Sequence, residues 1–214
     1  MGALTENKIY LATAVSAVLF FLVFSGKFWP GLDFWSLFSV TILLLLTAGL
    51  KLDPLFGPLI YGDFKERIWS AAGLGLASAA ALYVIFLIGN QLVHVFWPGS
   101  SDLLRSVYAL KYGSSRWRIG IFLALIIGPG EELWWRGFLQ RHWMARLGRW
   151  PGLLAVAALY AAVHLGSGNL LLVFAALVGG LWWGFQYLKF NSLLANIISH
   201  TVWDLLVFLI FPFN

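Results

Sequence analysis

Cysteine is absent from this chain of 214 residues, and only 11% of its residues are charged. Without cysteine the protein has no disulfide bridge, no thiolate nucleophile and no metal site with cysteine ligands. The low charge excludes an ordinary soluble domain, in which about a quarter of the residues are charged. Tandem repeats and low-complexity tracts are also lacking, which argues against a repeat protein or a disordered chain.

Apolar residues, in contrast, make up 61% of the chain, with 12 Trp and 18 Phe. Large aromatic side chains are common at membrane interfaces and in the cores of helical bundles. We therefore predict an all-α, polytopic transmembrane helical bundle that forms one membrane-embedded domain over residues 1–214. The net charge of +5 comes from basic residues in the connections. There it suits membrane topology and anionic lipid headgroups rather than nucleic acid. We expect a multi-pass protein of a prokaryotic cytoplasmic (inner) membrane.

About seven apolar stretches are candidate membrane spans, each of which needs roughly 20 residues. They cover residues 9–25, 34–50, 68–96, 118–140, 151–165, 170–189 and 192–212, and the fifth is short. No signal-peptide cleavage site follows the first, so it is interpreted as a span. Residues 51–67 contain prolines and glycines that predict a loop or an interfacial segment. Residues 101–112 predict an amphipathic helix on the membrane surface, either a lateral gate or a plain connector.

Two further features concern how the spans pack and which way they face. Small residues four positions apart in residues 179–184 predict close helix packing, without a functional role. The excess of basic residues in one set of loops favours an N-terminus inside the cell and, with seven spans, a C-terminus outside. The inner loops would hold Lys8, Lys51, Lys65, Arg67, Arg141, Arg146, Arg149 and Lys189, and the outer loops Lys27, Arg105, Lys111, Arg116 and Arg118.

Two adjacent glutamates stand in the middle of the fourth span. An ionisable residue inside a span is costly and is by default a sign of function. Residues i and i+4 share one face of a helix, so Glu132 is expected to pair with Arg136 while Glu131 remains a free carboxylate. Pro129 predicts a kink just before them, which would open the backbone and admit water. A carboxylate in such a place is suited to act as a general base toward water.

Two histidines lie in later spans. His164 ends a short apolar helix, and His200 precedes Asp204 by four residues in a span without another ionisable group. A carboxylate at this spacing can fix the tautomer and orientation of a histidine. Taken singly, each histidine is more often an interfacial or hydrogen-bonded residue than a catalyst. His94 and His142 stand near span ends and are interpreted as interfacial.

Together these fragments resemble the CPBP family of intramembrane proteases, which includes the type II CAAX prenyl endopeptidases and bacteriocin-processing or immunity-associated proteins. The family pattern is EExxxR, then FxxxH, then HxxxN or HxxxD, on helices that surround a membrane-embedded cavity. Here EExxxR is complete, Tyr160 replaces phenylalanine four residues before His164, and the third element is the aspartate variant. The resemblance covers residues 117–210, the expected catalytic core, whereas residues 1–100 are interpreted as accessory spans.

The resemblance implies a glutamate-type endopeptidase. Glu131, helped by His164, would activate the water that attacks the scissile carbonyl. His200 and Asp204 would stabilise the oxyanion. Because an ionised aspartate repels an oxyanion, Asp204 is either protonated or, in the interpretation we prefer, orients His200 while other donors serve the oxyanion. The other motif positions are expected to line the substrate cavity (Tyr160, Trp135) or to have structural and orienting roles (Glu132, Arg136).

The implied substrate is a membrane-anchored protein or peptide that is cleaved near its C-terminal tail. With the N-terminus inside, the site would lie in mid-membrane, closer to the outer side. A prenylated cytosolic protein is then an awkward substrate, whereas the membrane-anchored tail of an exported protein fits better. Apart from the lipid bilayer and this substrate, no partner is implied, and no cofactor is expected.

Several alternatives stay open. One glutamate and two histidines are ligand types for zinc, so a zinc-dependent protease with the same residues is a minority alternative, although an HExxH motif is lacking. A non-catalytic relative could bind a peptide or confer immunity. A transporter could use the buried charges as an ion path, but paired broken helices would then be expected. A lipid hydrolase, or a charge network that only locks the bundle, would also carry buried charges.

Overall fold

The computed structural model describes residues 6–26, 33–66 and 68–213, and their regular secondary structure is helical throughout. In chain order the elements are α1 (Glu6–Ser25), α2 (Phe34–Leu52), α3 (Phe56–Glu66), α4 (Ile68–Phe96), α5 (Ser100–Ala109), α6 (Arg116–Phe122), η1 (Leu123–Ile127), α7 (Gly128–Glu132), η2 (Leu133–Gln140), α8 (Arg141–Leu147), α9 (Arg149–Val163), η3 (His164–Ser167), α10 (Leu170–Phe190), α11 (Leu193–Leu205) and η4 (Leu206–Ile210). Three of the η segments are π-helical, and η3 is a 3₁₀ turn. The predicted all-α fold is confirmed. Lys27 and Arg67, counted above among the loop charges, lie outside the described residues.

Six helices in the described part of the chain are long and apolar enough to cross a membrane. They cover Asn7–Ser25, Phe34–Leu52, Ile68–Phe96, Arg149–Ser167, Leu170–Phe190 and Leu193–Ile210. The seventh predicted span, residues 118–140, is instead assembled from the short segments α6, η1, α7 and η2 in direct succession. The polytopic bundle is therefore confirmed, with the motif-bearing span as its irregular member.

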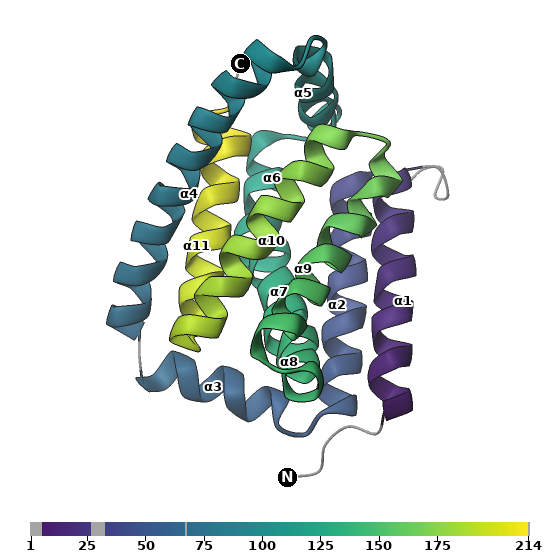
Figure 1. Cartoon of the computed structure of the whole chain (residues 1–214), viewed down its shortest axis with the longest axis vertical. Coiled ribbons are helices and arrows are strands. Elements are labelled where there is room, and N and C mark those ends of the chain that lie inside the picture. The colour runs from purple at the N-terminus through teal and green to yellow at the C-terminus, as the bar shows by residue number, and fades with distance from the viewer. Residues whose placement is uncertain (1–5, 27–32, 67, 214) are drawn as a thin grey trace.

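The long helices run roughly along one axis, and the described chain begins in α1 at one end of the bundle and finishes after α11 at the other (Figure 1). α3 crosses the end at which α1 begins, so the segment predicted as a loop or interfacial piece contains a helix. α5 lies at the opposite end, near the C-terminus, and confirms the helix predicted within residues 101–112.

Short polar side chains set the beginnings of several helices. Asp33 caps α2, where its carboxylate accepts hydrogen bonds from the backbone N–H groups of Trp35 and Ser36 at 3.1 and 3.2 Å. Asn169 and Ser192 cap α10 and α11 in the same way. Such caps satisfy backbone donors that a helix start leaves free, so these three helices begin at defined residues.

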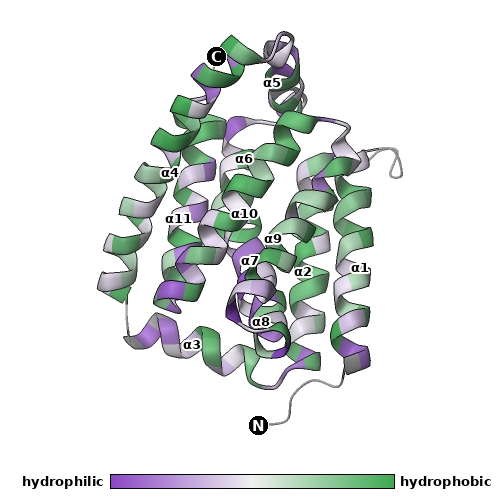
Figure 2. Ribbon diagram, in the orientation of Figure 1, coloured by the Kyte–Doolittle hydropathy of each residue, from purple (hydrophilic) through white to green (hydrophobic). Residues whose placement is uncertain are grey.

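The ribbons of the outer helices are coloured mostly as hydrophobic, and the hydrophilic colour of α7 lies in the middle of the bundle (Figure 2). Exposed positions include Leu11, Trp69 and Val95, whose side chains are 64, 87 and 74% exposed. Large exposed apolar surfaces are expected where a protein faces lipid rather than water. The charged motif residues Glu131, Glu132 and Arg136 are 4, 0 and 1% exposed, so the bundle shields them from its surroundings.

Two glycines bring α7 close to its neighbours. A Cβ atom added at Gly128 would lie 2.5 Å from Oγ1 of Thr201 on α11, and one added at Gly130 would overlap Cγ2 of Ile42 on α2. The irregularity predicted at Pro129 takes the form of π-helical segments on both sides of α7. Segments of this kind are frequent at functional sites. The local sequence thus positions two glutamates between α2 and α11.

Candidate functional site

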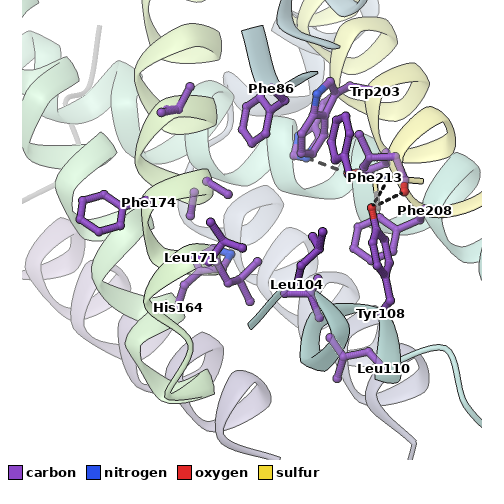
Figure 3. A pocket seen from close by; sticks show the side chains of 18 of the residues that line it. Phe86, Leu104, Tyr108, Leu110, His164, Leu171, Phe174, Trp203, Phe208 and Phe213 are labelled. Carbon is purple, nitrogen blue, oxygen red and sulfur yellow. Dashed lines mark hydrogen bonds and ion pairs between the residues drawn. The ribbon is translucent and has the colours of Figure 1, made fainter. Parts of the chain in front are cut away.

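A cavity of about 300 Å³ is lined mainly by residues of α4, α5, α10 and α11. Figure 3 shows its apolar walls, with Phe174 and Leu171 on one side and Trp203 and Phe208 on the other. The four residues expected to be catalytic all line it: Glu131, His164, His200 and Asp204. Each is no more than 5% exposed. Three separate stretches of the chain therefore bring their ionisable groups to one apolar cavity.

Glu132, next to Glu131, accepts more hydrogen bonds than the carboxylates that line the cavity. Its Oε1 atom accepts hydrogen bonds from Nη1 of Arg136 at 2.8 Å and from Nδ1 of His200 at 2.7 Å. Its Oε2 atom accepts a hydrogen bond from Nδ2 of Asn196 at 2.9 Å. The predicted Glu132–Arg136 ion pair is present, and Glu132 itself is fully buried. Because both of its oxygens accept hydrogen bonds, the Glu132 carboxylate is held in one position.

The Glu132 bond defines the orientation of His200. A carboxylate only accepts hydrogen bonds, so Nδ1 of His200 carries a hydrogen, and Nε2 is the atom that faces the cavity. Nε2 lies 3.8 Å from Oε2 of Glu131 and 3.7 Å from Oδ2 of Asp204. The imidazole also stacks on Trp183, with ring centroids 3.7 Å apart and planes at 18°. The close partner that orients His200 is thus Glu132, whereas Asp204 stands beyond hydrogen-bond distance on the other side of the ring.

Glu131 is the carboxylate with room to react. Its Oε1 atom is buried and has no hydrogen-bond partner among the described residues. A buried polar atom without a partner is costly and calls for an explanation such as a catalytic role or a bound water. The position agrees with the expectation that Glu131 is the free member of the pair.

His164 presents a free nitrogen to the same cavity. Its Nδ1 atom donates a hydrogen bond to the backbone carbonyl of Tyr160 at 2.7 Å, which leaves Nε2 as the acceptor in the neutral ring. The ring is held between Phe24, at a centroid distance of 4.0 Å, and Tyr160, at 4.9 Å. A histidine fixed in this tautomer can accept a proton or a hydrogen bond through Nε2.

Of the two aromatic residues expected to line the cavity, the structure places only Tyr160 there. Trp135 is not in the lining. It is fully buried behind Tyr160, with ring centroids 5.1 Å apart, and it also packs on Phe20 at 5.1 Å. The expectation for Trp135 is corrected accordingly: it supports the cavity wall from behind.

Two residues of the site were not predicted as functional. Asn196 lies four positions before His200, so the helical spacing that linked His200 to Asp204 also placed Asn196 on the same face. Trp183 belongs to residues 179–184, which were interpreted only as a packing segment. Its aromatic character gave no signal that distinguished a stacking partner of His200 from a core residue.

The ligand types that suggested zinc meet in the cavity without forming a ready metal site. Within residues 6–26, 33–66 and 68–213, no group of three or more His, Asp or Glu side chains is arranged to hold a metal ion. Nε2 of His200 lies 3.8 Å from the carboxylate of Glu131 and 3.7 Å from that of Asp204, which are distances for electrostatic contact.

Comparison with known proteins connects this site to a family. Residues 112–206 match the family model described as Type II CAAX prenyl endopeptidase Rce1-like. No curated protein and no solved structure matched the chain. The match confirms the resemblance to CAAX-type proteases over these residues and indicates, in general terms, an intramembrane protease that acts on a protein or peptide. Its six apolar helices make the protein an integral, multi-pass membrane protein.

Proposed function

Because residues 112–206 belong to the Rce1-like family of type II CAAX prenyl endopeptidases, we propose that this chain is a glutamate-type intramembrane endopeptidase. Its substrate is a membrane-anchored protein or peptide, cleaved near its C-terminal tail. The single observation that carries the proposal is the pairing of an unpartnered carboxylate with two oriented histidines in one buried, apolar cavity. Such a set supplies a general base (Glu131), a hydrogen-bond acceptor that orients the water (His164) and a group that stabilises negative charge (His200) at one place.

In the first step, Glu131 takes a proton from a water molecule in the cavity. His164 accepts a hydrogen bond from the same water through Nε2 and so orients it. The hydroxide attacks the carbonyl carbon of the scissile peptide bond and forms a tetrahedral intermediate with a negative oxygen. The proton held by Glu131 then passes to the amide nitrogen, the C–N bond breaks, and a carboxylic acid and an amine are released.

His200 stabilises the negative oxygen through Nε2–H when both ring nitrogens are protonated. Glu132 holds the ring from the opposite side, so Nε2 is preorganised toward the reacting centre. Asp204, at 3.7 Å from Nε2, stabilises the imidazolium by charge. This role replaces the orienting role that the sequence suggested for Asp204, and it keeps the carboxylate from having to contact the oxyanion directly.

The cavity walls favour an apolar substrate segment. Ile85 and Gly89 of α4 and Val178 of α10 line the cavity, and Ile85 and Val178 are 41 and 40% exposed. A chain segment anchored in the bilayer could therefore reach the site sideways, without crossing an aqueous phase. α5, which contributes Leu104 and Val107, covers the cavity at the C-terminal end of the bundle.

Cleavage by purified protein in liposomes, with candidate membrane-anchored tails as substrates, tests the proposal. Glu131→Gln, His164→Ala and His200→Ala are each expected to lower kcat at least about a hundredfold. His142→Ala is the matched control, since His142 lies outside the cavity lining. Activity that resists a strong chelator and disappears in the three variants supports the glutamate mechanism.

The other outcomes would each favour one of the alternative functions. Activity that is lost to the chelator and restored by zinc would favour a zinc-dependent protease that uses the same residues. Binding of a peptide without cleavage, by wild type and folded variants alike, would favour the non-catalytic immunity-type relative.

The exported-protein substrate depends on topology and has its own test. The described chain begins and ends at opposite ends of the bundle, and α9, which ends at Val163 directly before His164, runs toward the end where the chain finishes (Figure 1). Reporter fusions to each terminus are expected to place the N-terminus in the cytosol and the C-terminus outside. A cytosolic C-terminus would reverse the side from which substrates come and would leave the proposed chemistry untouched.

A further inference from the structure

A second buried polar cluster lies beside the candidate site and joins three spans. It consists of Ser78 on α4, Trp182, Trp183 and Gln186 on α10, and Ser199 on α11. Ser78, Trp183, Gln186 and Ser199 are 8, 2, 5 and 0% exposed. Polar side chains buried between membrane helices are uncommon and hold helices together through hydrogen bonds. None of these residues belongs to the family motifs discussed above.

The hydrogen bonds of the cluster have one consistent direction. Ser78 donates its hydroxyl hydrogen to Oε1 of Gln186 and accepts a hydrogen bond from the indole of Trp182 at 2.8 Å. Because this hydrogen is already used, Ser199 must be the donor in the 2.9 Å contact between the two hydroxyls. Ser199 in turn accepts a hydrogen bond from Nε1 of Trp183 at 3.1 Å. The indole of Trp183 is therefore fixed by a chain of bonds that begins on α4.

Trp183 connects this chain to the candidate site. Its ring stacks on His200 at a centroid distance of 3.7 Å. Its backbone carbonyl accepts a hydrogen bond from Nδ2 of Asn196 at 2.8 Å, and the same amide group donates to Glu132. The plane of His200 is thus defined by Glu132 at one edge and by Trp183 over one face. An aromatic face beneath a ring that becomes cationic also stabilises the cation.

We infer that Ser199, braced by Ser78 of α4, is a positioning residue that holds Trp183 as the plate on which His200 stacks. The inference rests on the proposed function for its catalytic consequence, but not for its structural content. It assigns α4, which lies outside the matched residues 112–206, a part in the geometry of the site. The competing explanation is a cluster that only fastens α4 to α10 and α11, without effect on His200.

Histidine-labelled protein in nanodiscs distinguishes the two explanations through the ¹⁵N resonances of the His200 ring, which report tautomer and charge. These resonances are assigned by their disappearance in His200→Gln. In Ser199→Ala, Ser78→Ala and Trp183→Phe they are expected to move from their wild-type positions, while those of His94 and His142 stay. In Ser78→Thr, which keeps a hydroxyl, the His200 resonances are expected to stay at their wild-type positions.

Ser16→Ala is the matched control, because Ser16 is also fully buried and its hydroxyl bonds only to the carbonyl of Thr13 within α1. If the protein cleaves, the cluster variants are expected to lose roughly tenfold or more in kcat with KM unchanged, since a misplaced group raises the barrier rather than weakening binding. Their thermal stability is expected to match that of Ser16→Ala.

Unchanged His200 resonances in folded Ser78→Ala and Trp183→Phe would overturn the inference, even if Ser199→Ala fails to fold. Resonances that move in a protein that cleaves no substrate would support the positioning of His200 and count against the proposed function. Loss of stability in all cluster variants with His200 resonances in place would identify a fastening role only.

Discussion

Glu131 and Glu132 are neighbours in the chain but have opposite environments. Glu132 accepts hydrogen bonds at both oxygens, whereas Oε1 of Glu131 has no partner in the described part of the chain. Removing one member of a buried ion pair leaves the other charge without compensation, which is more costly than losing the pair as a whole. Arg136, which is not part of the cavity lining, is therefore expected to compensate the charge of Glu132.

Arg136→Met is expected to lower the free energy of unfolding by about 3 kcal/mol, because the Glu132 carboxylate then stays buried without its cation. The double variant Glu132→Gln/Arg136→Met is expected to recover part of this loss, since it removes the uncompensated charge. Thermal or denaturant unfolding in detergent measures both, and Glu132→Gln completes the double-mutant cycle. A double variant as unstable as the sum of the two single variants would show that the charges do not interact.

Helical spacing was sufficient to predict the Glu132–Arg136 pair, because four residues along a helix return to the same face. It was not sufficient for the bond between Glu132 and His200, which are 68 positions apart and meet only through the packing of α11 on α7. Trp135 shows a further limit of the sequence. It stands four residues after Glu131, yet it packs behind Tyr160 rather than in the cavity lining, which depends on how α9 packs against η2.

At the scale of the element, α7 depends on two close approaches. Gly130 faces Ile42 of α2, and Gly128 faces Thr201 of α11, so any larger side chain would push these helices apart. Glycine in a helix costs roughly 1 kcal/mol relative to alanine. The cost is offset here because only glycine lets the glutamates of α7 come within reach of His200.

Gly130→Ala is expected to destabilise the protein by about 1–3 kcal/mol, since its Cβ would overlap Cγ2 of Ile42. Ile42→Ala in the same chain removes that atom and is expected to restore part of the stability. Gly73→Ala on α4, where an added Cβ meets no atom within 4 Å, is the control and should be neutral or slightly stabilising. Equal unfolding temperatures for Gly130→Ala and Gly73→Ala would contradict the packing explanation.

An ion pair at the C-terminal end of the bundle links two elements that flank the cavity. Nη2 of Arg118 on α6 lies 2.5 Å from Oδ2 of Asp33, the N-cap of α2. Burial tends to raise the pKa of the Asp33 carboxyl, but hydrogen bonds from Arg118 and Ser36 outweigh it, so the pKa lies below its usual value of 3.8. A lowered pKa means that the folded state prefers the ionised carboxylate.

Asp33→Asn keeps the helix cap and removes the charge, so it isolates the ion pair. The pair is partly exposed, and its expected contribution is at most about 1 kcal/mol. That contribution is present above the unfolded pKa and is lost as pH falls through the lower, folded pKa. Unfolding temperatures of wild type and Asp33→Asn are therefore expected to differ at pH 7 and to converge in acid. A difference that is independent of pH would rule out a charge effect.

The elements themselves were largely predictable, because long apolar stretches and short polar caps determine where spans begin and end. The fourth span was the exception. Its π-helical segments stand on both sides of the closely packed Gly128 and Gly130, and a single sequence does not show which helices will lie against these glycines. The most irregular element is also the one that carries the motif.

At the scale of the whole molecule, α4 and α10 together supply much of one wall of the cavity. Ser78 of α4 joins α10 through the polar cluster, and Trp97, directly after α4, packs on Phe174 of α10 with ring centroids 6.1 Å apart. Between these two contacts, residues of both helices line the cavity, Gly89 among them. We expect a membrane-anchored substrate to reach Glu131 between these two contacts.

A bulky side chain at Gly89 should obstruct this path without disturbing the fold, because an added Cβ there meets no atom within 4 Å. Gly89→Trp is expected to lower kcat/KM for a membrane-anchored substrate about tenfold, which corresponds to about 1.4 kcal/mol of lost transition-state stabilisation. Gly73→Trp is the matched control, since Gly73 is equally open on the same helix but lies outside the cavity lining. Both variants should unfold at the temperature of the wild type. If Gly89→Trp cleaves as fast as Gly73→Trp, substrates do not pass between α4 and α10, and entry beneath α5 becomes the remaining route to Glu131.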